Sequence, residues 1–250
     1  MRAQATAACS QAAVHRFATI RKRAEVRKGG VAALQTLLPN PPDEARLRAL
    51  PDDRVLAEMA RRIFSAGFVW RVIEQKWPGF EAAFLGFDIA RLTFEPDEFW
   101  ERLTRDDRIV RHAAKIMAVR SNARFVRDIA AEHGSFGRFL ADWPASNLAG
   151  LLEVLAKRGT RLGGLTGQYF LRFVGKDCWI LNPDVVACLR DAGVEVSETA
   201  SSKRDLRLAQ DCFNAWAKET GLPLTHLSRI CALSIGANYA SVEAAAEVGC

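Results

Sequence analysis

The sequence predicts an all-α protein, and three observations lead to this prediction. Apolar residues recur at helical spacing in long runs, for example between Val55 and Phe64. Clusters of proline and glycine separate these runs and mark the expected helix ends. No stretch shows a sustained period-2 alternation, and no repeat of fixed length is present, so a β-rich or repeat architecture is not expected.

Composition fits a globular protein with a polyanionic partner. The chain has 250 residues, of which 49% are apolar and 26% charged, enough for one large domain or two closely packed ones. No run approaches the roughly 18 apolar residues of a membrane helix. The net charge of +6 favours binding to a polyanion. Six scattered cysteines without a CxxC pair favour a reducing compartment over a disulfide framework.

The N-terminal half reads as a series of helices separated by breakers. Residues 1–30 carry seven Lys or Arg and one acid, and they are expected to form a basic helical arm that ends at two glycines. The next helix, 31–38, stops at a proline cluster, and residues 43–50 show no clear pattern. Further helices are expected at 55–64, from 70 to 77 with an end at Pro78-Gly79, around 80–87, after Pro96, from about 109 to 129, and around 136–140.

The C-terminal half is organised around a glycine hairpin. A helix near residues 148–155 leads into the segment Leu162-Gly163-Gly164-Leu165-Thr166-Gly167, and an amphipathic helix follows it. The chain then continues through a turn at 182–184, a polar linker at 193–203 with a short strand-like stretch at 194–196, and helices at 204–220 and 223–236, the last with Thr225 as a candidate capping residue.

The hairpin is a candidate site for a phosphate. Backbone N–H groups at the start of a helix, next to its positive dipole end, bind phosphate, and glycine lets a ligand approach them closely. A hydrophobic-Gly-hydrophobic hairpin between two helices is the pattern of the helix-hairpin-helix, which grips the DNA backbone. A simple αα-hairpin whose glycines serve packing is the alternative. We expect backbone contacts from Gly164, Thr166 and Gly167, with charge added by Arg161, Arg172 and Lys176 unless these form only a solvated helix face.

Ordered landmarks resemble one known family. Gly67-Phe68-Val69-Trp70 resembles its Gly-Leu-Ser-Trp motif, and the helix with Ile109-Val110-Arg111-His112, Lys115-Ile116 and Asn122-Ala123 resembles its Ile-Arg-His…Lys-Ile…Asn-Ala pattern. The hairpin and then Asn182 follow at similar distances. The family is 3-methyladenine DNA glycosylase I, in the helix-hairpin-helix DNA glycosylase superfamily. The similarity covers roughly residues 53–190, whereas the last two helices look more like those of endonuclease III relatives.

The resemblance implies a fold and a function. Two all-α lobes would hold a lesion pocket in the cleft between them, with residues 1–50 as an added arm and 51–250 as the glycosylase-like domain. The protein would be a monofunctional glycosylase that flips an alkylated purine, such as 3-methyladenine, out of damaged double-stranded DNA and hydrolyses its N-glycosidic bond. We expect a cytoplasmic, nucleoid-associated monomer with no membrane partner and no cofactor. Many relatives carry zinc, but Cys9 with His15 and His226 with Cys231 lack the usual ligand spacing, so no metal is expected.

The resemblance also suggests a base pocket. Trp70 is the candidate wall for a cationic base, with Phe68 or Phe64 beside it, although core packing between the lobes would equally explain a tryptophan. Arg62 falls at the position of the family's pocket glutamate and has the opposite charge. Glu58, one helical turn earlier, is a candidate replacement for that carboxylate.

Catalytic candidates follow the hairpin. Asn182 falls where many superfamily members carry an aspartate and where the methyladenine branch carries asparagine. Asp184 is a second candidate, or else a helix-capping residue. Gln168 falls at the Schiff-base lysine position of bifunctional members, which disfavours an abasic lyase.

Three alternatives stay open. Arg62 at the glutamate position would suit a fold that grips DNA without chemistry. The same residue would suit a glycosylase for a neutral or oxidised base, since it would repel a cation. A helical scaffold unrelated to nucleic acid would use the hairpin for packing alone.

Overall fold

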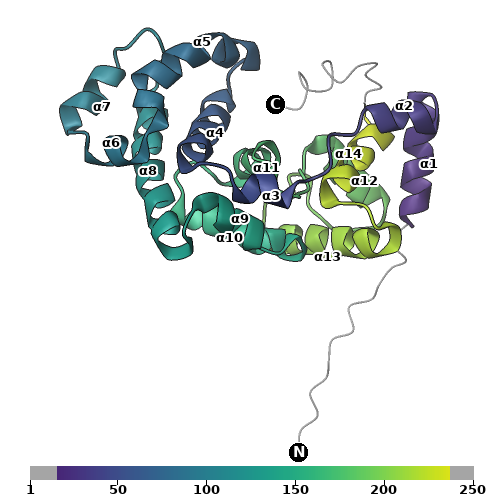
Figure 1. Cartoon of the computed structure of the whole chain (residues 1–250). Coiled ribbons are helices and arrows are strands. Elements are labelled where there is room, and N and C mark those ends of the chain that lie inside the picture. Colours follow the sequence, from purple (N-terminus) through teal and green to yellow (C-terminus); the bar gives the residue numbers. More distant parts are fainter. Residues whose placement is uncertain (1–15, 237–250) are drawn as a thin grey trace, which may run out of the picture.

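The chain folds into helices only, as the sequence predicts. A computed structural model describes residues 16–236, and within this range every regular element is an α-helix or a short 3₁₀ helix (Figure 1). Residues 1–15 of the predicted basic arm, which include Cys9 and His15, lie outside the described residues. In the described range, no helix has both the length and the apolar character needed to cross a bilayer.

The first lobe is built around α4 (Asp52–Ser65) and the long helix α8 (Ala113–His133), which pack against each other. Its centre is aromatic: the Phe64 ring lies 4.7 Å from that of Phe80 and 6.4 Å from that of Phe84. The remaining elements of this lobe are α5 (Trp70–Ala83), η1 (Leu85–Phe87), α6 (Ile89–Phe94), α7 (Asp97–Leu103) and α9 (Phe136–Asp142).

The second lobe combines the two ends of the described chain. Helix α1 (Phe17–Lys28) packs against α14 (Leu224–Ser234), and the rings of Phe17 and Trp216 lie 5.4 Å apart. Phe17 is fully buried because α1 turns an apolar stripe toward the lobe, so α1 belongs to this lobe and is not a separate arm. The other members are α2 (Val31–Thr36), α12 (Pro183–Asp191) and α13 (Lys203–Thr220).

Between the lobes lie α3 (Glu44–Arg48), α10 (Leu148–Arg158) and α11 (Gly164–Phe173) (Figure 1). The short helix η2 (Ala145–Asn147) leads directly into α10. The proline-rich segment before α3 is fastened to α14 of the second lobe. His226 Nε2 lies 2.8 Å from the Pro39 carbonyl oxygen, and Arg229 Nε donates to the Leu37 carbonyl at 3.3 Å. The chain therefore runs from the second lobe to the first along a defined path.

Helix α5 does not end at Pro78, in contrast to the prediction. It continues to Ala83 because Phe80 and Ala83 bury their side chains in the first lobe, which outweighs the one hydrogen bond that a proline removes. Gly79 has a packing role, since a side chain there would collide with the backbone carbonyl of Arg108.

Two smaller predictions were wrong. Residues 194–196 form no strand: the Val196 N–H donates to the Val194 carbonyl in a tight turn. Thr225 does not cap α14. The Asp177 carboxylate accepts from the backbone N–H groups of Leu224 and Thr225, so the cap comes from a residue distant in sequence.

The motif residues Lys115 and Asn122 hold the backbone in place. The Lys115 ammonium donates to the carbonyls of Phe64 and Ala66 at 3.1 and 2.6 Å, and so satisfies the C-terminal end of α4. Asn122 is fully buried and makes two hydrogen bonds to the backbone of Thr160, which ties α8 to the hairpin.

Lys115 makes the stability of the protein pH-dependent. Burial, together with the charge of Arg161, lowers the pKa of Lys115 from 10.5 to about 8. Between these two values the unfolded chain binds more protons than the folded protein, so the free energy of unfolding rises with pH. We expect the stability difference between wild type and Lys115→Met to shift in favour of wild type between pH 8 and 10 in urea unfolding. The exposed Lys157→Met is the control, and an equal pH response of both variants would contradict the assignment.

Candidate functional site

The glycine hairpin joins α10 to α11 and presents the start of α11 to solvent. Gly163 is the N-cap, no side chain caps the helix, and Gly164 is exposed with open space where a Cβ would stand. The backbone N–H groups of a first helical turn lack intrahelical acceptors, so they are suited to an anion. Thr166 is partly exposed on the same turn, and Arg161 is exposed just before it.

Three of the predicted phosphate contacts have other surroundings. Gly167 is buried, and a side chain there would collide with the Leu162 carbonyl oxygen, so this glycine serves hairpin packing. Lys176 is only 5% exposed and donates to the Trp143 carbonyl. Arg172 lies two turns along α11 and donates to the Cys178 carbonyl and the Ser228 hydroxyl at 2.6 and 2.9 Å. Lys176 and Arg172 therefore do not stand around the start of α11.

An aromatic corner forms where α5 meets α11. The Trp70 ring lies 5.5 Å from the Phe173 ring and 6.3 Å from the Tyr169 ring. The Arg62 guanidinium lies over both walls of this corner, 4.3 Å from the centre of Trp70 and 4.1 Å from that of Phe173. A cation of the protein itself thus occupies the ring faces of the corner.

Arg62 is held by Glu58, one turn earlier on α4. Their nearest atoms, Nε and Oε1, are 2.6 Å apart, and the Arg62 side chain is only 3% exposed. Burial raises the pKa of Glu58 and lowers that of Arg62, while each partner's charge opposes the shift of the other. Within the described residues, Arg62 Nη1 is buried without a hydrogen-bond acceptor.

The other predicted pocket aromatics lie elsewhere. Phe64 is fully buried in the core of the first lobe and lines no cavity near Trp70, because its face of α4 points toward Phe80 and Phe84. Phe68 is 38% exposed, and its ring lies 4.4 Å from the Lys115 ammonium. The aromatic neighbours that Trp70 does contact, Tyr169 and Phe173, were not predicted. Their spacing of four residues on an amphipathic helix was the available signal.

Two cavities lie between the lobes, on either side of Phe173. The first, here named the tryptophan cavity, has a volume of about 590 Å³, and its lining includes Trp70, Tyr169, Arg172, Asn182 and Arg229. It therefore combines Trp70 of the first lobe with Asn182 of the second, two residues that the sequence predicts for one site.

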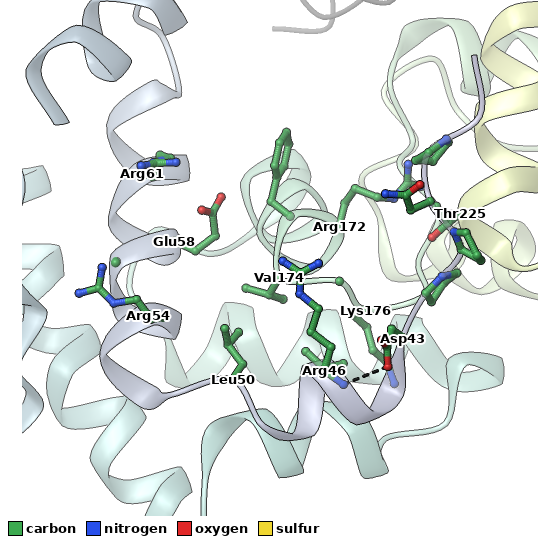
Figure 2. A pocket seen from close by; sticks show the side chains of 18 of the residues that line it. Asp43, Arg46, Leu50, Arg54, Glu58, Arg61, Arg172, Val174, Lys176 and Thr225 are labelled. Atoms are coloured by element: carbon green, nitrogen blue, oxygen red, sulfur yellow. Dashed lines mark hydrogen bonds between the residues drawn. The ribbon is translucent and has the colours of Figure 1, made fainter. Parts of the chain in front are cut away.

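The second, named the glutamate cavity, has a volume of about 490 Å³. Figure 2 shows Arg54, Glu58 and Arg61 along α4 on one side of it and Arg172 and Lys176 on the opposite side. Glu58 thus faces the space between the lobes, but in a different cavity from Trp70 and Asn182.

The two post-hairpin candidates face different surroundings. Asn182 is the N-cap of α12, and its Oδ1 accepts from the Val185 N–H at 2.9 Å. Asp184 does not line the tryptophan cavity. It lies against Gly236, and burial raises its pKa while the charge of Arg27 lowers it. Gln168, buried in α11, accepts from the Leu181 N–H and so fixes the segment that leads to Asn182.

No metal site stands out in the part of the chain that the structure describes, where no group of three or more His, Cys, Asp or Glu side chains is placed to hold an ion. His226, considered above as a nominal zinc ligand, contacts the Pro39 carbonyl instead.

Comparison with known proteins finds similarity over the part of the chain that contains the motifs around Trp70 and Lys115. Residues 48–150 match the methyladenine glycosylase family, which confirms the resemblance seen in the sequence. DNA-3-methyladenine glycosylase 1 of Escherichia coli (strain K12) is 29% identical over 141 residues, which is 49% of this chain and 74% of that protein. Glu58, Arg62 and Trp70 lie inside the family match, whereas the hairpin and Asn182 follow it.

Solved structures of 3-methyladenine DNA glycosylase I are also similar. One is 25% identical, covers 54% of this chain and 81% of its own, and has a TM-score of 0.45. Another, from Staphylococcus aureus and described as showing the basis of 3-methyladenine recognition, is 25% identical, covers 51% and 81%, and has the same TM-score.

Proposed function

From the relationship of residues 48–150 to the methyladenine glycosylase family, we propose that this chain is a monofunctional DNA glycosylase that removes a damaged purine from double-stranded DNA. The name of its Escherichia coli relative makes 3-methyladenine the reference lesion. The observation that carries the proposal is the tryptophan cavity, where Trp70 and Asn182 from the two lobes line one space. Acting on chromosomal DNA, the protein would work at the nucleoid.

The cavity suits a base that has been flipped out of the duplex. A base in the stack is out of reach of an enzyme, so the target nucleotide must leave the helix and enter a pocket that replaces its stacking partners. Trp70 would stack on the base, and Asn182 would hydrogen-bond to the substrate or to the attacking water. The N–H groups of Gly164 and Thr166, in the first turn of α11, which no side chain caps, would bind a phosphate of the same strand.

Hydrolysis then requires no covalent intermediate with the protein. The glycosidic bond breaks, water adds to the sugar carbon, and the products are a free base and an abasic site. Gln168 is not a nucleophile and is engaged with the Leu181 N–H, in keeping with a monofunctional enzyme. Glu58 would act by holding Arg62 in the aromatic corner, since it faces the other cavity.

A paired substitution tests the two parts of the site. Trp70→Ala should reduce base release by about tenfold or more, because base–aromatic stacking contributes about 1–3 kcal/mol, and it should spare binding to undamaged duplex. Gly164→Ala should weaken binding to all duplexes alike. The φ of +58° at Gly164 is strained for alanine, so the first turn of α11 would shift, and the added methyl group would stand where the backbone of DNA approaches.

The measurement is the release of bases from methylated, etheno-adducted and deaminated duplexes, resolved by chromatography, beside salt-dependent duplex binding. Release of any damaged base, lost in Trp70→Ala, is the expected result. Absence of release together with binding that does not weaken with salt would reject both the enzyme and the DNA site.

One observation favours a second candidate function, a DNA-binding protein without catalysis. No carboxylate lines the tryptophan cavity within the described residues, and the sequence resemblance assigns Arg62 to the position of the family's glutamate. Salt-sensitive duplex binding without release of any base from the whole panel would be the result that this candidate predicts.

A further inference from the structure

The charged side chains that line the tryptophan cavity in the described part of the chain are all positive. Arg172 and Arg229 line it, and no Asp or Glu is among its described lining residues. Arg172 is held in place by the Cys178 carbonyl and the Ser228 hydroxyl, so it is not free to swing out to solvent. Arg229 is fixed through its Nε to the Leu37 carbonyl.

A third guanidinium, that of Arg62, packs on two aromatic rings of the cavity but is not among the lining residues itself. Arg62 stacks on Trp70 and Phe173 from a position that is 3% exposed, and both rings line the cavity. An aromatic ring attracts a cation through the negative charge of its face. Here that attraction is already used by Arg62. A cationic base stacked on the other face of Trp70 would meet the guanidinium as a like charge, which the Glu58 carboxylate, 2.6 Å from Arg62, offsets only in part.

We propose that the tryptophan cavity selects an uncharged purine lesion with hydrogen-bond acceptors, and that Arg62 is the residue that turns cationic bases away. This inference rests on the proposed function and narrows its substrate class. Carbonyl oxygens and ring nitrogens are the groups that guanidinium N–H donors recognise on a base. Deaminated, oxidised and neutral alkylated purines carry such groups without a fixed charge.

The chemistry of an uncharged base agrees with this environment. When the bond between the sugar C1′ and the purine nitrogen breaks, the electron pair leaves with the base, which departs as an anion. Water adds to the sugar cation at C1′ and loses a proton, which the base anion takes up. Fixed positive charge near the departing base stabilises the transition state in which that negative charge develops. A cationic base would leave as a neutral molecule and gain nothing from Arg172 and Arg229.

A pair of lesions that differ only in charge tests the inference. Duplexes of one sequence would carry 7-methylguanine, which is cationic, or 7-methyl-7-deazaguanine, which has the same shape and no charge, each on a 2′-fluoroarabinose sugar that resists cleavage. Binding is measured by fluorescence anisotropy beside the undamaged duplex. We expect wild type to bind the uncharged lesion about tenfold more tightly than the cationic one. A factor of ten corresponds to about 1.4 kcal/mol, which is the order of the repulsion between partly solvated like charges several ångströms apart.

The variants assign the effect to Arg62. Arg62→Gln should reduce the preference at least about threefold. The double change Glu58→Gln with Arg62→Gln removes the guanidinium without leaving an unpaired carboxylate. It should also reduce the preference for the uncharged lesion over the cationic one. Arg127→Gln is the control, since Arg127 is exposed on α8 and its hydrogen bonds go to the neighbouring Asp128.

Each outcome decides the question. Equal binding to all three duplexes, or a preference of wild type for the cationic lesion, would overturn the inference while leaving the glycosylase proposal to the release assay. A preference that persists unchanged in both Arg62 variants would overturn the assignment to Arg62. If wild type binds none of the three duplexes even at low salt, the result would instead contradict the proposed function itself.

Discussion

Replacing Gly167 with alanine is expected to lower the free energy of unfolding by about 3 kcal/mol, although alanine is the better helix former. The Cβ of an alanine at this position would collide with the Leu162 carbonyl oxygen. A backbone carbonyl cannot rotate away as a side chain does, so the hairpin itself must open. Since 1.36 kcal/mol corresponds to a factor of ten, the ratio of folded to unfolded protein should fall by about two orders of magnitude.

The same substitution at Gly163 is the control. Gly163 is exposed and has a φ of −81°. A Cβ at this position would lie 3.8 Å from its nearest neighbour, Ala156 Cβ, which is an ordinary contact. Gly163→Ala should therefore change the unfolding free energy by less than about 0.5 kcal/mol. Urea unfolding followed by circular dichroism measures both variants. Similar stability of the two would mean that the close approach of α11 to Leu162 is not required for the fold.

This pair of glycines illustrates how far the sequence predicts the site. The pattern of the hairpin marks its position correctly, because the apolar periodicity of α10 and α11 defines both flanks. It does not distinguish a glycine that lets a ligand approach from one that lets two backbone segments touch. That distinction depends on where Leu162 points after the fold has formed, and only the structure contains it.

The aromatic corner shows a second limit. Trp70 is recognised through its motif, but its partners come from α11, about 100 residues later, and no local pattern joins the two helices. Phe64 is predicted as a pocket neighbour of Trp70, yet it points into the first lobe. Helical periodicity predicts that a face is apolar and does not predict which neighbour covers it, so the predicted core residue and the predicted pocket residue could not be separated.

Arg62→Ala is expected to destabilise the protein by about 3 kcal/mol, because it leaves the Glu58 carboxylate in a largely buried position without the guanidinium 2.6 Å away. The double change Glu58→Gln with Arg62→Gln should recover most of this loss, since neither side chain is then charged. The non-additivity of Glu58→Gln, Arg62→Gln and the double variant that combines them measures the coupling.

The surface pair of Arg158 and Glu132 is the matched control for this coupling. Its contact is just as short, 2.6 Å, but its side chains are 39% and 47% exposed, so Arg158→Ala should cost less than about 1 kcal/mol. Equal losses for Arg62→Ala and Arg158→Ala would show that the Glu58 pair is as well solvated as a surface pair. A large loss only for Arg62→Ala would instead establish that the fold maintains a buried cation behind Trp70, which is the condition on which charge selection in the tryptophan cavity depends.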